Sequence, residues 1–256
     1  MKIKNLYRIE KSILFLCYNI FGDNMKKSLE KYELFITIFL IVIYLVFNSI
    51  CINNFGEYSI YTFLCNLVLS LGIVIFIIRN KLSKYYSLNS FPSPKKFLYF
   101  IPMILLVFVN FIGGVGINNT FSEILFYMLT MLCVGFLEEI IFRGFLYKKL
   151  ARESENIAII VTTITFGIGH ILNLFNGAEL VPTLLQICYA MAGGYLFVMV
   201  LIKSKSLWPC IITHSLLNSL SIFSIGSGVV YTYLVPVLLF VISLSYALYV
   251  RKIKVR

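Results

Sequence analysis

The sequence predicts an all-α fold, a polytopic membrane bundle of about eight transmembrane helices with both termini in the cytoplasm. Of the 256 residues, 60% are apolar and 13% are charged, whereas soluble domains are about 45–50% apolar and about 25% charged. The mean hydropathy is +0.92. Apolar runs of about 20 residues, long enough to cross a bilayer as a helix, recur along the chain. The Lys and Arg residues lie in alternate loops or at the ends of these runs.

The eight expected spans can be followed in order by their polar content. The first three, 34–52, 59–78 and 97–117, contain no charged residue and no histidine. The fourth, 121–147, is the least regular because it carries three acidic residues and one arginine. The others contain no Asp, Glu, Lys or Arg but include the two histidines of the chain, and they are 156–175, 180–202, 207–224 and 229–250. No soluble segment separates these spans, so residues 1–256 are expected to form a single integral membrane domain.

The distribution of basic residues predicts the orientation, since cytoplasmic loops of membrane proteins are enriched in Lys and Arg. Seven precede the first span, five follow the second, four surround the end of the fourth, two follow the sixth and four follow the eighth, which accounts for all 22. The four intervening loops contain none. Both termini are therefore expected in the cytoplasm. The net charge of +11 is then explained by a lipid surface, and no nucleic-acid partner is expected.

The N-terminal segment 1–33 is expected to be cytoplasmic or interfacial. Its apolar part, within Met1 to Phe21, is not followed by a small-residue cleavage site, so an interfacial helix is favoured over a signal peptide. The chain also carries no eukaryotic retention signal. We therefore expect a multi-pass protein of a cell membrane, and specifically of a bacterial plasma membrane.

Six ionisable side chains fall inside the expected spans, where each costs about 2.5–3.5 kcal/mol on insertion scales and suggests a function. They are Glu123, Glu138, Glu139, Arg143, His170 and His214. A carboxylate such as Glu123 at the start of a helix is explained by the helix dipole alone. The other five require a separate explanation.

Helical spacing separates the two adjacent glutamates. Glu139 and Arg143 are four residues apart, on one face of a helix and in the favourable acid-before-base order, so we expect an ion pair. Glu138 points about 100° away and lacks that partner. It is therefore the candidate for general acid–base chemistry.

The two histidines occur in short motifs on separate spans. Phe166 and His170 share one helix face, and two glycines between them allow a neighbouring helix to approach closely. His214 and Asn218 share another face, and both side chains can donate hydrogen bonds, as an oxyanion site requires. Each motif is weak by itself, but their occurrence together in a chain with so few polar residues predicts an active site.

These residues are where the chain resembles the CAAX protease and bacteriocin-processing family, also called CPBP or Abi. The signature of that family is Glu-Glu-x-x-x-Arg, Phe-x-x-x-His and His-x-x-x-Asn on successive spans. This chain matches it with Glu138-Glu139 and Arg143, then Phe166 and His170, then His214 and Asn218. The resemblance extends over 121–224, which would be the catalytic core.

The resemblance implies a glutamic-type intramembrane endopeptidase that needs no cofactor. By this comparison Glu138 and His170 activate the attacking water, His214 and Asn218 stabilise the tetrahedral oxyanion, and Glu139 and Arg143 are supporting residues. Zinc remains an alternative, because one Glu and two His could complete a three-ligand site, namely Glu138, His170 and His214. The absence of H-E-x-x-H favours the metal-free interpretation.

Two other functions compete with the enzyme. A non-catalytic scaffold or bacteriocin-immunity protein would be favoured by lost motif residues, and none is lost. A transporter would also place charges in the membrane, but the chain shows no internal repeat and its polar groups cluster on three of eight spans. The substrate, a membrane-associated peptide or a lipidated protein, is not specified by these motifs.

Overall fold

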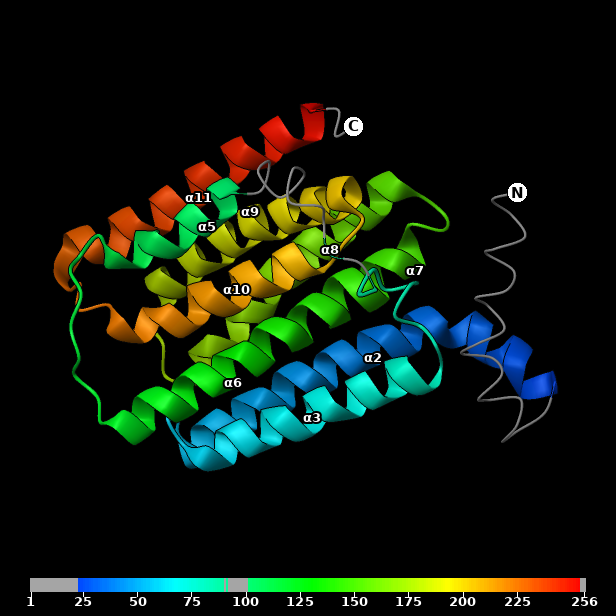
Figure 1. Cartoon of the computed structure of the whole chain (residues 1–256), viewed down its shortest axis with the longest axis horizontal. Coiled ribbons are helices and arrows are strands. Elements are labelled where there is room, and N and C mark those ends of the chain that lie inside the picture. The colour runs from blue at the N-terminus through cyan, green and yellow to red at the C-terminus, as the bar shows by residue number, and fades with distance from the viewer. Residues whose placement is uncertain (1–22, 90, 92–100, 254–256) are drawn as a thin grey trace.

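The computed structural model describes residues 23–89, 91 and 101–253 (Figure 1). Its regular elements in these ranges are all helices, and the one extended pairing is an isolated bridge between Val115 and Ser224. The all-α prediction is therefore confirmed. The interfacial helix expected within Met1 to Phe21 lies outside the described residues.

In chain order, the described helices are α2 Asp23–Phe55, α3 Ile60–Arg79, α5 Ile101–Val107, η2 Phe108–Phe111, α6 Phe121–Glu139, η3 Ile140–Tyr147, α7 Lys148–Leu150, α8 Glu155–Gly169, η4 His170–Leu174, α9 Leu180–Ser204, α10 Trp208–Leu220, η5 Ser221–Phe223 and α11 Gly228–Lys252. The segment η3 is a π-helix that joins α6 to α7, and the three segments form one continuous helix.

Six helices, some of them made of consecutive segments, are long and apolar enough to cross a membrane. They are Tyr32–Phe55, Ile60–Arg79, Phe121–Leu150, Glu155–Leu174, Leu180–Ser204 and Tyr231–Lys252. Each overlaps one of the expected spans. The protein is therefore a membrane protein, and its described residues contain six apolar helices of spanning length.

The other two expected spans contain shorter helices. The segment expected as 97–117 includes the apolar helix Ile101–Phe111, and the segment expected as 207–224 includes α10 of 13 residues followed by η5. The fold thus supports a count of six spans by length, and the count of eight stays a prediction. The α10 helix carries the buried polar side chains of Thr213, His214, Ser215 and Ser219.

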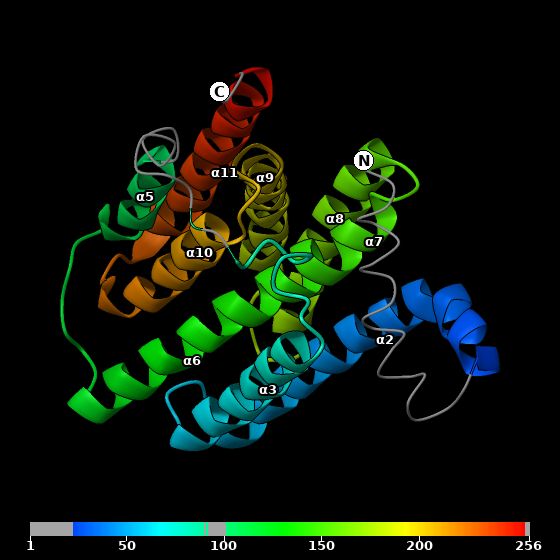
Figure 2. The ribbon, with the colours of Figure 1, turned by 45° about the vertical axis from the view of Figure 1, so that its right-hand side comes forward.

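The helices pack side by side, with the α2–α3 hairpin on one side of α6 and α10 on the other. Figure 2 shows α6 between that hairpin and the group formed by α9, α10 and α11, while α8 lies against α9. Two glycines permit close approaches between neighbouring helices. A Cβ on Gly135 of α6 would lie 2.8 Å from Ser215 Cα of α10, and one on Gly167 of α8 would lie 2.9 Å from the Ile187 carbonyl of α9. The first contact holds two motif-bearing helices, α6 and α10, together, and the second holds the third, α8, against α9.

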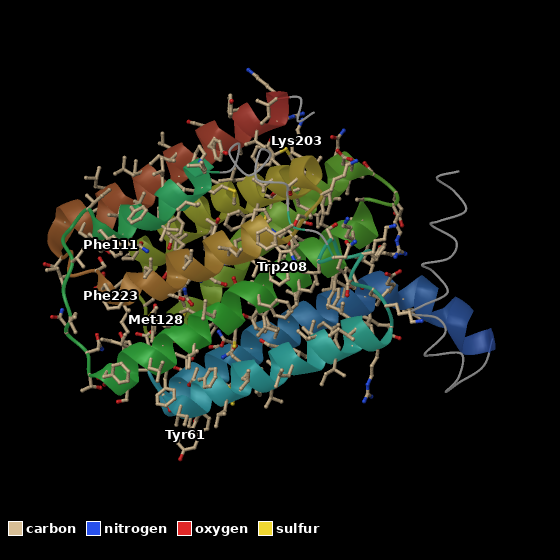
Figure 3. All side chains as sticks on the ribbon, viewed as in Figure 1. Tyr61, Phe111, Met128, Lys203, Trp208 and Phe223 are labelled. Carbon is tan, nitrogen blue, oxygen red and sulfur yellow. The ribbon has the colours of Figure 1, made fainter. Side chains whose placement is uncertain are left out.

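The bundle has two chemically different ends. We call the basic end the one where α3, α7, α9 and α11 finish, with the described basic residues Arg79, Lys81, Lys84, Lys148, Lys149, Arg152, Lys203, Lys205, Arg251 and Lys252. The opposite end contains the α2–α3 turn, the start of α6, η2 and η5. In Figure 3, Lys203 lies at the first end, whereas Tyr61, Phe111 and Phe223 lie at the second.

Candidate active site

The two adjacent glutamates lie at the end of α6, directly before the π-helix η3. Such wide π-helical turns are frequent at functional sites. The α-helical spacing used to interpret the sequence does not predict this switch from an α-helix to a π-helix. Even so, Arg143 Nη1 lies 3.0 Å from Glu139 Oε1, so the ion pair expected from the spacing is present.

This ion pair is fully buried, with both side chains 0% exposed. The guanidinium carbon of Arg143 lies 4.0 Å from the ring centroid of Phe166 and 5.5 Å from that of Phe197. Among the described residues, Arg143 Nε and Nη2 have no hydrogen-bond partner. The faces of the two rings therefore add a cation–π attraction to the ion pair with Glu139 and partly offset the loss of water around this cation.

His214 lies between the two carboxylates. Its Nδ1 is 2.8 Å from Glu139 Oε1, and its Nε2 is 3.6 Å from Glu138 Oε2. Because Glu139 is ion-paired as a carboxylate, it can only accept, so Nδ1 carries the proton and donates it in this hydrogen bond. This contact corrects one sequence inference. A neutral His214 has no second N–H to offer, so it can donate to an oxyanion only when Nε2 is also protonated.

Glu138 is only partly buried, and besides His214, which it shares with Glu139, it contacts a group that Glu139 does not. The hydroxyl of Tyr44, on α2, donates to Glu138 Oε1 at 3.4 Å. Glu138 also lines the central cavity described below. These contacts agree with the expectation that Glu138 has no cationic partner on its own helix.

His170 lies where α8 ends and the tighter helix η4 begins. Its Nδ1 is 3.1 Å from the Phe166 carbonyl oxygen, an acceptor, so Nδ1 donates and Nε2 is left as the acceptor of a neutral ring. The ring also packs edge-on against Phe166, with centroids 5.4 Å apart. The Phe-x-x-x-His motif thus fixes the orientation of the imidazole through both its backbone and its aromatic ring.

A cavity of about 350 Å³ brings the four candidate catalytic residues together, and its volume is within the range of ligand sites, about 300–1,000 Å³. Glu138, His170, His214 and Asn218 all line it. Glu139 and Arg143 do not line it but lie behind His214. A smaller cavity of about 60 Å³ adjoins it and shares Glu138 and His170.

Sequence interpretation missed several polar residues of this site. Tyr44 and Asn48 occur four residues apart in an otherwise apolar span, and this Tyr-x-x-x-Asn spacing was the available signal. Further amide and hydroxyl side chains also line the cavity, namely Thr62, Asn110, Tyr127, Thr130, Asn173, Gln186, Tyr189, Thr213, Ser221 and Ser243. They come from helices whose relative positions the sequence does not specify.

The three residues considered above as zinc ligands are not arranged as a metal site. Within the described ranges, no group of three His, Cys, Asp or Glu side chains is placed to hold a metal ion. The set proposed above, Glu138, His170 and His214, does not form one. We therefore derive no step through a metal.

Comparison with known proteins gives one family. Residues 120–220, from the N-cap of α6 to the end of α10, match the Rce1-like type II CAAX prenyl endopeptidases. No curated protein matches the chain. No solved structure matches it either. The matched segment contains all three motifs, and the family resemblance that these motifs indicated is thereby confirmed for residues 120–220.

Proposed function

We propose that the protein is a CAAX-protease-like intramembrane endopeptidase of the glutamic type, which hydrolyses peptide bonds of membrane-associated substrates. The observation that carries this proposal is the convergence of Glu138, His170, His214 and Asn218 on one cavity within the membrane helices. The family match supports the same reaction class. The intact motifs argue against the alternative of a non-catalytic scaffold or immunity protein.

In the proposed reaction, Glu138 and His170 hold a water molecule, and Glu138 takes its proton as the oxygen attacks the peptide carbonyl carbon. The carbonyl π bond opens to an oxyanion, which accepts hydrogen bonds from the Asn218 amide and from protonated His214. The C–N bond then breaks, and the proton passes to the leaving amine nitrogen. The imidazolium form of His214 would lie between Glu138 and Glu139, a favourable position for a positive charge.

A peptidomic comparison tests the function directly. Membranes that contain the wild-type chain should accumulate peptide fragments that are absent when Glu138→Gln replaces it. Glu123→Gln is the matched control, because this carboxylate lies on the same helix but caps its N-terminus with Thr120. Identical peptide profiles for all three would favour the scaffold or immunity role.

Metal dependence separates the glutamic mechanism from the zinc alternative. We expect the purified protein to retain its full cleavage rate after treatment with a strong zinc chelator, since the activated water is held by Glu138 and His170. The measurement compares rates before chelation, after it and after zinc is restored. Loss of activity that zinc restores would establish the metalloprotease interpretation.

We further propose eight spans with both termini in the cytoplasm, on the basis of the basic residues. Single cysteines in the loops near Glu57, Asn118, Asn176 and Gly226 should then react with an impermeant thiol reagent added outside intact cells. Glu153→Cys, in an exposed loop at the basic end, should not react. Labelling of any of the four loops only after the cytoplasmic face is opened would contradict this topology.

Tyr44 is expected to position Glu138 rather than to react. Tyr44→Phe removes the hydroxyl that donates to Glu138 Oε1, and a hydrogen bond contributes about 0.5–1.5 kcal/mol, so we expect kcat to fall by about 2- to 12-fold. The value of KM should change little. Steady-state kinetics measure both constants, and an unchanged kcat would show that this contact has no part in catalysis.

A further inference from the structure

The cavity lies on only one side of the catalytic residues. On α6 its lining residues run from Tyr127 to Glu138 and then stop. On α10 and the η5 turn that follows it, which run the other way, they begin at Thr213 and continue to Ser221. Both sets extend from the catalytic level toward the opposite end of the bundle, and neither extends toward the basic end.

Toward the basic end the space is filled by packed side chains. Beyond Glu138 and before Thr213 no residue of α6, η3 or α10 lines either of the two cavities, except Phe142 in the smaller one. Six apolar side chains at this level are only 0–1% exposed, namely Ile140, Phe142, Leu146, Leu196, Leu207 and Cys210. The buried Arg143–Glu139 pair lies in the same layer. A peptide could reach Glu138 from the basic end only by displacing this core.

Toward the opposite end the cavity extends to the surface loops. Its outermost lining residues include Glu57 in the α2–α3 turn, Asn110 in η2 and Ser221 in η5, of which Glu57 and Ser221 are partly exposed. In Figure 3 the labelled neighbours of these segments, Phe111 and Phe223, lie at the end far from Lys203. The route to the catalytic residues therefore begins at the end that carries no basic loop.

The chemistry of this route favours a peptide over an isoprenoid chain. The outer part of the cavity presents amide and hydroxyl groups from several helices, among them Asn48, Asn173, Gln186, Tyr189 and Thr130. Asn173 donates to Gln186 and the Thr130 hydroxyl donates to the Phe126 carbonyl. The remaining N–H groups and lone pairs of these side chains can pair with the C=O and N–H groups of an extended backbone, which an apolar chain cannot offer.

We propose that the substrate enters from the end opposite the basic end, which is the extracytoplasmic side by the distribution of Lys and Arg, and that it is an unlipidated, polar peptide segment in extended form. This inference rests on the proposed function and on the proposed orientation. It separates the protein from an enzyme that processes the C-termini of prenylated proteins at the cytoplasmic face.

Gly193 offers a probe inside the cavity that leaves the catalytic residues unchanged. It lines the cavity from α9, and a Cβ added there would meet no atom within 4 Å. Gly72 is the matched control, because its Cβ would also meet nothing within 4 Å but the residue is exposed on the outside of α3, among apolar neighbours. Both are changed to Cys in a chain whose six native cysteines are replaced by Ala. If that chain does not fold, the buried Cys51 and Cys210 are retained.

The probe is a small cationic methanethiosulfonate, which does not cross membranes. We expect it to modify Gly193→Cys in intact cells and to leave it unmodified when applied only to the cytoplasmic face of inside-out vesicles. Gly72→Cys should stay unmodified from both sides. Glu57→Cys and Glu153→Cys report the outer and inner faces. Modification of Gly193→Cys from the cytoplasmic face alone would overturn the proposed entry.

Protection of Gly193→Cys tests the substrate class without requiring turnover. In the Glu138→Gln background, a pool of unmodified peptides added outside should slow the modification at least as much as the same pool carrying a farnesyl group. Protection by the farnesylated pool alone would overturn the peptide proposal. If access is from outside but the wild-type chain cleaves no peptide, the proposed function fails while the entry route stands.

Discussion

Glu138→Gln should abolish peptide-bond hydrolysis and leave the protein folded. The amide has the shape of the acid and can still accept the hydrogen bond from Tyr44, but it cannot take a proton from water. General acid–base catalysis contributes about 10²- to 10⁴-fold, so the cleavage rate should fall by at least this factor. Glu138 has no cation on its own helix, so its neutralisation leaves no buried positive charge.

The measurement is the single-turnover cleavage rate of the purified proteins, together with the melting temperature in detergent. Glu123→Gln, at the other end of α6, should retain the wild-type rate because its carboxylate only caps the helix. A Glu138→Gln protein that cleaves at the wild-type rate would remove Glu138 from the reaction.

Glu139→Gln should instead cost stability. The carboxylate of Glu139 is the ion-pair partner of Arg143, and both side chains are 0% exposed. Removal of one partner from a buried ion pair costs about 3–5 kcal/mol, because the other charge stays buried without compensation. We therefore expect a lower melting temperature and a lower yield of folded protein.

A double variant shows whether the uncompensated charge is the cause. Glu139→Gln combined with Arg143→Met removes both charges and keeps an apolar stem beside Phe166 and Phe197. Its melting temperature should recover toward that of the wild type. If Glu139→Gln is stable but inactive while Glu138→Gln still cleaves, the roles of the two glutamates are the reverse of those proposed.

The sequence could predict those features that depend on a single helix. The Glu139–Arg143 pair follows from a spacing of four residues, and the capping role of Glu123 follows from its place at a helix start. Both were present in the structure. The π-helix after Glu139 shows that local spacing has limits, because η3 changes the turn although Ile140–Tyr147 contains no Pro, and its one glycine, Gly144, does not specify a π-helix.

Features that depend on two helices could not be predicted in the same way. The contact of His214 with Glu139 joins α10 to α6, and the contact of Tyr44 with Glu138 joins α2 to α6. The motifs indicated that His214 belonged to the site, but not which of its nitrogens would be free. Likewise, eight apolar runs do not specify how many become full-length spans, since α10 is short and polar on its inner side.

One oxygen atom, Glu139 Oε1, accepts from both Arg143 and His214. It therefore links the folding of the bundle to the placement of the imidazole. Because one oxygen atom serves both contacts, a change at any of these three positions weakens both the stability of the fold and the placement of the His214 ring. Evolution by single substitutions is therefore constrained at these positions. Glu138 and His170 carry no such double role. In descendants that abandon proteolysis and persist as scaffolds, we expect Glu138 and His170 to diverge first, while Glu139, Arg143 and His214 persist as a structural remnant of the ancestral enzyme.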